Sequence, residues 1–376
     1  MRDGDEAPGP DDWIGRLDYR LARAGLTRIS AGRILLGFAI GFGGAGLFIL
    51  LRLPLPWFLG SLTACLMASI ANVPFARPVQ FSVSMRAVLG VAVGAAFSPE
   101  LMARFGSMTL SLALLFPFMI AIIILGMLYF ERIAGYDRPT AFFCAVPGGL
   151  TDMVTMAADA GASPRIVTLS QATRIVLIVF LLPFWLQWVG GRSIGISVPG
   201  ALHINQFLLV DAMTLVVLGW VGWRFAERIG LAGAPLVGPM ILSGLAHAFG
   251  LTAAKIPIEI LIFAQVTLGI LLGAQFRGLR FSEFSSTILW GGVFSIVLVM
   301  VTGLVALLVS RLTGFDSTTV LLAYAPGGQS ELNLIAYILN LDVAYTALHH
   351  LVRLAIVIFG AQIVFRANPK WREPRK

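Results

Sequence analysis

Apolar residues fill most of this chain in long blocks, and short polar stretches separate one block from the next. Blocks such as 108–129 and 288–309 hold roughly 20 mostly apolar residues, enough for a helix to cross a hydrocarbon core of about 30 Å. The pattern predicts apolar elements in the first half near residues 34–51, 55–72, 80–98, 108–130, 140–161 and 165–188. It predicts the elements of the second half near 206–223, 234–250, 257–276, 286–310, 319–341 and 344–365.

The second half of the chain repeats features of the first at an offset of 179 residues. The tripeptide Pro147-Gly148-Gly149 returns as Pro326-Gly327-Gly328, and a hydroxyl residue and an acid follow each copy. So many coincidences at one offset predict an internal duplication. Other matches at this offset are Arg132 with Arg311, Asp137 with Asp316, Arg174 with Arg353, and Leu89-Gly90 with Leu268-Gly269.

The predicted fold is an all-α, polytopic membrane protein made of two six-element repeats. The fifth element of each repeat is broken or made re-entrant by its Pro-Gly-Gly segment. The expected organisation is a cytoplasmic basic tail (1–33), a first membrane repeat (34–189), a Gly-rich linker (190–205), a second membrane repeat (206–366) and a cytoplasmic tail (367–376).

Composition supports the membrane assignment. The chain is 58% hydrophobic and 12% charged, with a mean hydropathy of +0.88, whereas soluble domains carry about 25% charged residues. The net charge of +8 sits mainly at the ends and in short loops, where cytoplasmic topology signals are expected. We therefore expect no direct contact with nucleic acid.

Other chemistry is not indicated by the sequence. Cys65 and Cys144 both lie in apolar segments, which argues against a disulfide framework. The histidines offer no metal-ligand spacing, and adjacent residues such as His349 and His350 point about 100° apart on a helix. We expect no metal, no cofactor and no enzymatic activity.

The fifth element of each half decides the topology. If all twelve elements cross the membrane, the halves are parallel. If the fifth elements are re-entrant hairpins, the halves are inverted, and Arg165, Arg224, Arg228, Arg277 and Arg280 become cytoplasmic. The positive-inside rule favours the second arrangement, with both termini cytoplasmic.

The two Pro-Gly-Gly breaks are candidate binding sites. Proline removes a backbone donor and glycine permits unusual dihedral angles, so each break leaves two half-helices with free ends inside the membrane. Thr151 and Ser330 suit the N-cap of the second half-helix. Its free N–H groups can bind an anion, and the carbonyls before the break can bind a cation.

Four charged residues near the breaks carry the expected chemistry. Asp152 and Glu331 are candidate ion-coupling groups, because a charge near the bilayer centre costs at least a few kcal/mol and a helix dipole returns only about 0.3–1 kcal/mol. Arg174 and Arg353 lie about ten residues into the sixth elements, roughly 15 Å from the helix start, and are the expected partners of these acids or of an anionic ligand. The alternatives are acids that only stabilise helix starts and arginines in structural salt bridges.

The halves differ in ways that can set substrate choice. Gln329 and Asn333 replace Leu150 and Val154 of the first half. His350 lies near Arg353 in the sixth element of the second half. Arg86 and Gln275, in the third and ninth elements, are weaker candidates for the site.

The doubled motif resembles the bacterial membrane AbrB family, whose members carry an AbrB duplication membrane domain. It reads Ala-Val-Pro-Gly-Gly-Leu-Thr-Asp-Met at 145–153 and Ala-Pro-Gly-Gly-Gln-Ser-Glu-Leu-Asn at 325–333. Family members have been labelled as regulators of gene expression or as ammonia monooxygenases. The resemblance implies a multi-pass protein of the bacterial inner membrane. A monooxygenase needs a redox cofactor, for which this sequence shows no binding motif.

The sequence therefore predicts a secondary transporter for a small anionic or carboxylate-bearing solute, coupled to H⁺ or Na⁺. The expected partners are this solute, the coupling ion and membrane lipid. The alternative is a membrane-bound ligand sensor that acts indirectly on gene expression. The predicted binding residues are Pro147, Gly148, Gly149, Thr151, Asp152, Arg174, Pro326, Gly327, Gly328, Gln329, Ser330, Glu331, Asn333, His350 and Arg353.

Overall fold

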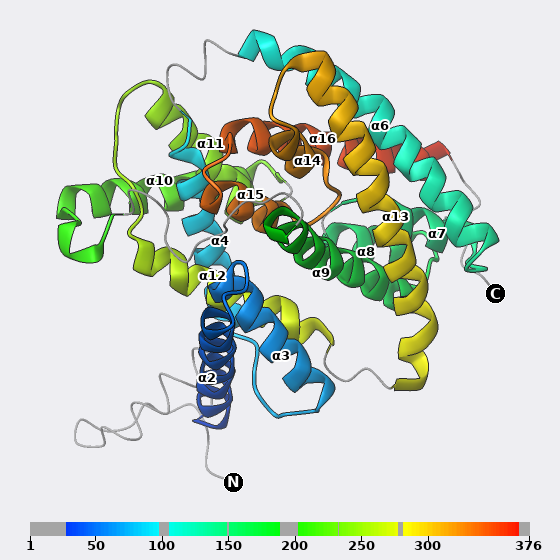
Figure 1. The fold of residues 1–376 in the computed structure, drawn as a ribbon, viewed down its shortest axis with the longest axis horizontal. Coiled ribbons are helices and arrows are strands. Elements are labelled where there is room, and N and C mark those ends of the chain that lie inside the picture. The colour runs from blue at the N-terminus through cyan, green and yellow to red at the C-terminus, as the bar shows by residue number, and fades with distance from the viewer. Residues whose placement is uncertain are drawn as a thin grey trace.

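The computed structural model describes residues 28–97, 105–148, 150–188, 202–231, 233–276 and 281–367. In these segments the regular structure is helical throughout, which confirms the predicted all-α fold (Figure 1). The predicted basic tail up to residue 27, linker residues 190–201 and the tail from residue 368 onward lie outside the described residues.

The helices follow the apolar blocks of the sequence. The first half contains α2 (Arg28–Leu50), the π-helical turn η1 (Pro56–Gly60), α3 (Ser61–Ile70), α4 (Val79–Gly94), α6 (Phe105–Arg132), α7 (Arg138–Ala145), α8 (Leu150–Asp159) and α9 (Pro164–Trp188). The second half contains η2 (Ile204–Gln206), α10 (Leu209–Arg228), α11 (Ala234–Ala248), α12 (Ile258–Gly273), η3 (Ala274–Phe276), α13 (Phe281–Thr313), α14 (Ser317–Tyr324), α15 (Gln329–Ile338) and α16 (Val343–Ala367).

Seven of the described helices are long and apolar enough to cross a membrane, which indicates a multi-pass membrane protein. These segments are Ala31–Leu50, Gly106–Arg132, Pro164–Gln187, Leu209–Arg228, Ile258–Phe276, Ser286–Thr313 and Val343–Ala361. Pro56–Ile70, Val79–Gly94 and Ala234–Ala248 are shorter apolar helices. The 15 residues of α11 extend about 22 Å, which is less than a hydrocarbon core of about 30 Å.

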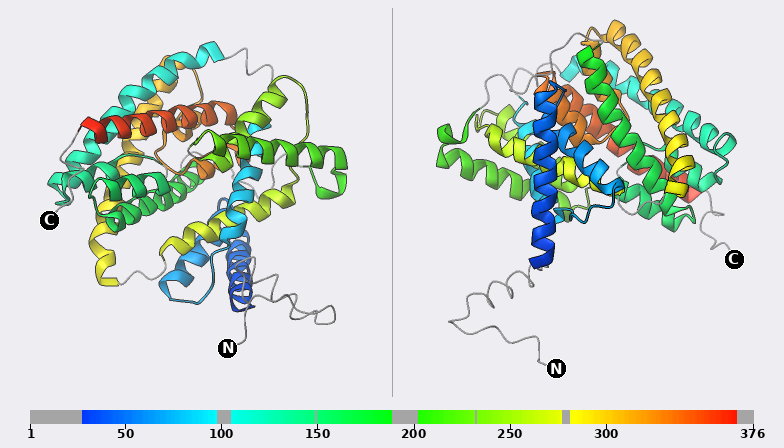
Figure 2. Two further views of the ribbon diagram at one scale, coloured as in Figure 1. Left: turned by 180° about the vertical axis from the view of Figure 1, so that it is seen from behind. Right: turned by 60° about the horizontal axis from the view of Figure 1, so that its bottom comes forward.

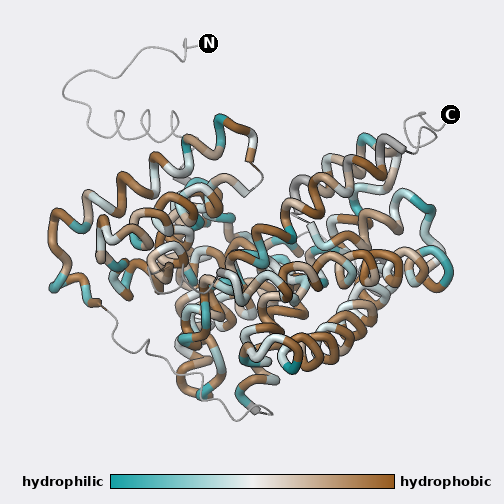
Figure 3. Tube along the Cα trace, turned by 90° about the horizontal axis from the view of Figure 1, so that it is seen from above, coloured by the Kyte–Doolittle hydropathy of each residue, from teal (hydrophilic) through white to brown (hydrophobic). Residues whose placement is uncertain are grey.

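The outer surfaces of the long helices are hydrophobic. On α10 the side chains of Leu209, Val216, Trp220 and Phe225 are all more than half exposed. Figure 3 shows hydrophobic stretches along the helices, with hydrophilic positions mainly where the chain turns. Apolar surface of this extent suits contact with lipid tails rather than water.

The two halves pack into each other. Helix α12 of the second half contacts α2, η1 and α3, while α4 of the first half contacts α10 and α11. Helix α13 packs on α9, and α16 packs on α6. Figures 1 and 2 place α10 at one end of the molecule and α6 with α13 at the other.

Matching glycines allow two of these close contacts. A Cβ at Gly90 in α4 would lie 2.3 Å from the carbonyl oxygen of Leu236, and one at Gly269 in α12 would lie 2.6 Å from that of Phe58. Both positions therefore require glycine for backbones to approach so closely. Gly90 and Gly269 stand at the 179-residue offset.

Each fifth element consists of two short helices that fold back on each other. Helix α7 contacts α8, and α14 contacts α15. The amide of Ser163 donates to Thr140 Oγ1 at 3.0 Å, which joins the end of the first pair to its beginning. Beside the second pair, the ring of Phe315, just before α14, lies 4.6 Å from the ring of Tyr345 in the first turn of α16. The membrane topology of these segments, re-entrant or crossing, stays a prediction.

Accessibility labelling tests the re-entrant topology. In a Cys65→Ala, Cys144→Ala background, Arg138→Cys at the start of α7 and Asp159→Cys at the end of α8 should react with impermeant thiol reagents from the same side of the membrane. The side chains of Arg138 and Asp159 are both exposed. A third variant, Gln187→Cys, lies at the far end of α9 and should react from the opposite side. Reaction of Arg138→Cys and Asp159→Cys from opposite sides would reject the hairpin.

Candidate functional site

A cavity of about 350 Å³ lies where the two Pro-Gly-Gly segments approach each other. Its volume falls near the lower end of the roughly 300–1,000 Å³ found for small-molecule sites. Helices α4, α9, α11, α12 and α16 contribute its walls, and we call it the tip cavity. Its lining residues are Arg86, Pro147, Gly148, Ile175, Gly233, Pro235, Leu236, Leu272, Gln275, Gly327, Gly328, Gln329, Ser330, Glu331, His350, Arg353 and Leu354.

We call the two segments at the breaks tips: the first lies between α7 and α8, and the second lies between α14 and α15. They form because the chain leaves its helical conformation at each break. Helix α7 ends at Ala145 and α14 ends at Tyr324, and extended residues follow each of them. The last carbonyls of a helix have no partner within the helix. Surrounded by apolar side chains, these carbonyls need donors from elsewhere in the protein.

In the first half the donors come from α9. The Nε2 atom of Gln171 donates to the carbonyls of Phe143 at 2.7 Å and Val146 at 2.9 Å. The guanidinium group of Arg174 donates to Val146 at 3.4 Å and to Gln171 Oε1. Both side chains are almost completely buried, so α9 holds the first tip through polar contacts shielded from lipid.

In the second half α16 does the same at matching positions. The Nε2 atom of His350 lies 3.0 Å from the carbonyl oxygen of Leu322. Arg353 donates to the carbonyls of Ala325 and Gly327, the latter at 3.2 Å. His350 stands at the 179-residue offset from Gln171, and Leu322 stands at that offset from Phe143.

The sequence offered an acid or an anionic ligand as the partner of Arg353, and the described structure shows no ion pair between Arg353 and Glu331. Arg353 donates to backbone carbonyls, and Glu331 forms no hydrogen bond or ion pair with the described residues. The carboxylate instead folds back over the start of α15, where a Cβ at Gly328 would lie 1.9 Å from Glu331 Oε2. The unpaired helix-end carbonyls lie nearer to the guanidinium group and take its donors.

The cavity brings together many of the predicted residues. Those that line it are Pro147, Gly148, Gly327, Gly328, Gln329, Ser330, Glu331, His350 and Arg353. Arg174, Pro326 and Asn333 are buried and do not line it. Gly149 and the side chains of Thr151 and Asp152 lie outside the described residues, although the backbone of Thr151 and Asp152 is part of α8.

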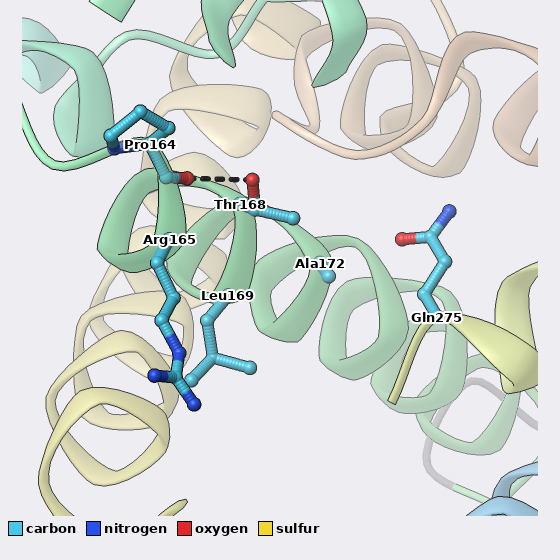
Figure 4. Close-up of a pocket in the computed structure, with 6 residues that line it drawn as sticks. All are labelled: Pro164, Arg165, Thr168, Leu169, Ala172 and Gln275. Carbon is cyan, nitrogen blue, oxygen red and sulfur yellow. Dashed lines mark hydrogen bonds between the residues drawn. The ribbon is translucent and has the colours of Figure 1, made fainter. Parts of the chain in front are cut away.

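Two residues that the sequence ranked low also line the cavity. Arg86 on α4 has no hydrogen bond or ion pair with the described residues. Gln275 in η3 has a buried Oε1 atom without a partner. It also lines a second cavity of about 280 Å³ and points toward the first turns of α9 (Figure 4). A polar residue inside an apolar helix was the only signal for either of them.

The chemistry of the tip cavity suits an anion. Among its described side chains Arg86 and Arg353 are positive and Glu331 is negative, so the lining carries a net positive charge. Within the described residues, no three His, Cys, Asp or Glu side chains come together as metal ligands.

Comparison with known proteins identifies related chains. The family model described as "Transition state regulatory protein AbrB" matches residues 57–368. "Uncharacterized protein YhjN" from Bacillus subtilis (strain 168) is 25% identical, over 85% of this chain and 89% of that protein. "Putative regulator AbrB" from Escherichia coli (strain K12) is 23% identical, over 85% of this chain and 91% of that protein.

The support of the first tip by Gln171 can be measured as stability. Gln171→Leu leaves the Phe143 and Val146 carbonyls short of donors, and we expect it to lower the free energy of unfolding by about 2–5 kcal/mol. Thr173→Val is the matched control on the same helix, because Thr173 Oγ1 is buried without a partner. This variant should be neutral or stabilising. Thermal unfolding in detergent compares the two, and equal losses of stability would refute the role of Gln171.

Proposed function

The chain belongs to the AbrB family, and we propose that it is a secondary transporter for a small anionic solute, coupled to H⁺ or Na⁺. The tip cavity is the observation that carries this proposal. It lies between backbone tips from both halves of an apolar, multi-helix chain. Transporters with duplicated halves commonly bind their substrates at interrupted helices that meet in this way.

The solute that suits the cavity carries a carboxylate or a similar anionic group. Arg86 offers a guanidinium group without a partner among the described residues, and Arg353 adds a second positive charge. Guanidinium groups bind carboxylates with paired hydrogen bonds. The start of α15, with the amides after Gly328, adds a positive dipole end on the same side.

Coupling is assigned to the acids that follow the breaks. Glu331 lines the tip cavity without a hydrogen bond or ion pair from the described residues. A carboxylate at this depth is expensive to keep charged, and a proton or Na⁺ that binds with the solute lowers the cost. Asp152 occupies the matching position of the first half. We propose movement of an unaltered solute across the inner membrane rather than catalysis, with both termini cytoplasmic.

A ligand sensor is the second candidate, because one relative carries the name of a regulator. A sensor could bind the same anion in the same cavity and alter gene expression indirectly. Net movement of solute distinguishes the two functions, since a sensor needs binding alone.

Flux measurements test the transport proposal. Purified protein in proteoliposomes should take up a carboxylate, first identified by thermal shift against a metabolite panel, under an imposed pH or Na⁺ gradient. Glu331→Gln and Asp152→Asn should abolish or uncouple this flux, because they remove the charge and keep the side-chain size. Protein stability should hold or rise.

Asp159→Asn is the control for these variants, because Asp159 is an exposed acid at the end of α8. It should transport at the wild-type rate. Ligand binding without flux under any gradient would favour the sensor. Wild-type flux and unchanged ion dependence in both acid variants would remove Asp152 and Glu331 from the mechanism.

A further inference from the structure

We infer that the solute of the tip cavity carries an O–H or N–H donor beside its anionic group, and that His350 Nδ1 accepts a hydrogen bond from it. This inference rests on the proposed function and narrows the solute to a hydroxy- or amino-carboxylate. Two observations support it: His350 is one of the residues that line the cavity, and its buried Nδ1 atom has no hydrogen-bond partner among the described residues.

The hydrogen-bond role of Nδ1 is fixed by the other ring nitrogen. The Nε2 atom lies 3.0 Å from the carbonyl oxygen of Leu322, and a carbonyl oxygen can only accept. Nε2 therefore carries the proton. Nδ1 is left with a lone pair, provided that the ring is neutral.

The surroundings keep the ring neutral. His350 has no exposed surface, and Arg353, which carries a positive charge, stands three residues further along the same helix, about one turn away. A second positive charge in such a site is disfavoured both by desolvation and by repulsion. Nδ1 is consequently an acceptor, and a buried acceptor without a donor is costly.

The other half of the molecule shows that the framework does not require a histidine. Gln171, at the position that matches His350, donates to the carbonyl that matches Leu322 and uses its Oε1 atom to accept from Arg174. Gln171 is thus satisfied within the protein and does not line the cavity. A histidine at 350 supplies the same donor and adds an acceptor that the protein itself leaves unused.

The rest of the lining complements a carboxylate with an adjacent donor. Arg86 and Arg353 supply positive charge, and Gln329 Nε2 is a further donor without a partner. Gln275 Oε1 is a further acceptor without a partner. The cavity therefore presents donors for the anionic group and acceptors for a hydroxyl or amino group.

Matched ligand pairs test the inference. Binding of lactate is compared with propionate, malate with succinate, and alanine with propionate, by thermal shift and calorimetry on the purified full-length protein. The wild type should bind the donor-bearing member of at least one pair about tenfold more tightly. The alanine and lactate arms distinguish an amino from a hydroxyl donor.

His350→Gln is the decisive variant. Its amide can donate to the Leu322 carbonyl as Gln171 does to Phe143, but it lacks an acceptor at the position of Nδ1. We expect the preference for the donor-bearing ligand over its partner to fall to within about twofold. His350→Asn, which restores an acceptor near the position of Nδ1, should retain the preference.

His349→Gln is the control, because both ring nitrogens of His349 already have partners in Ser111 and Tyr345. Its ligand preference should match the wild type. Equal binding within every wild-type pair, or a full preference in His350→Gln, would overturn the inference and leave carboxylate transport standing. Failure of all of these carboxylates to bind would instead overturn the proposed function together with the inference.

Discussion

The need to pair backbone carbonyls at interrupted helices governs the centre of this protein. Hydrocarbon offers no donors, so a helix that ends inside a membrane requires polar side chains from its neighbours. Gln171 and Arg174 meet this need on α9, and His350 and Arg353 meet it on α16. Each of these pairs lies in the middle of an apolar helix, and its role as donor to the helix-end carbonyls explains why polar residues are found there. The tips that result present free backbone groups and fixed charge to one cavity.

Much of this arrangement could be predicted from the sequence, because lipid imposes strict rules on chain pattern. Apolar blocks located the helices, and Pro147 and Pro326 located the interruptions between α7 and α8 and between α14 and α15. The partners of Arg353 could not be read from the sequence. The acid that follows the break, or an anionic ligand, was the expected partner, whereas in the structure Arg353 donates to the carbonyls of Ala325 and Gly327. Every residue has a backbone carbonyl, so the sequence does not show which carbonyls lack a partner. Only the structure shows whether a carbonyl or a carboxylate accepts the hydrogen bonds of an arginine.

The residues that form the walls of the cavity could not be predicted from the sequence either. Leu236 and Leu272 line it through the packing of α11 and α12, and nothing distinguishes them from other leucines of the chain. Arg86 and Gln275 were detectable as polar residues in apolar helices but gave no indication of what they face. The crossing of α4 by α11 brings Arg86 to the site, and that contact depends on Gly90. Position in the fold, rather than residue type, gives these side chains their place.

The two halves share a framework but do not share their chemistry. At the second break, Ser111 on α6 of the first half bonds to the hydroxyl groups of Tyr324 and Tyr345 and to His349, which joins α14 and α16 to α6. The first half has alanine at the position that matches Tyr324, so its tip lacks this buried network. Residues at matching positions of the two halves therefore differ in whether the protein itself supplies all of their hydrogen-bond partners. Two adjacent residues show the same contrast. Both ring nitrogens of His349 have partners, whereas Nδ1 of His350 has none among the described residues.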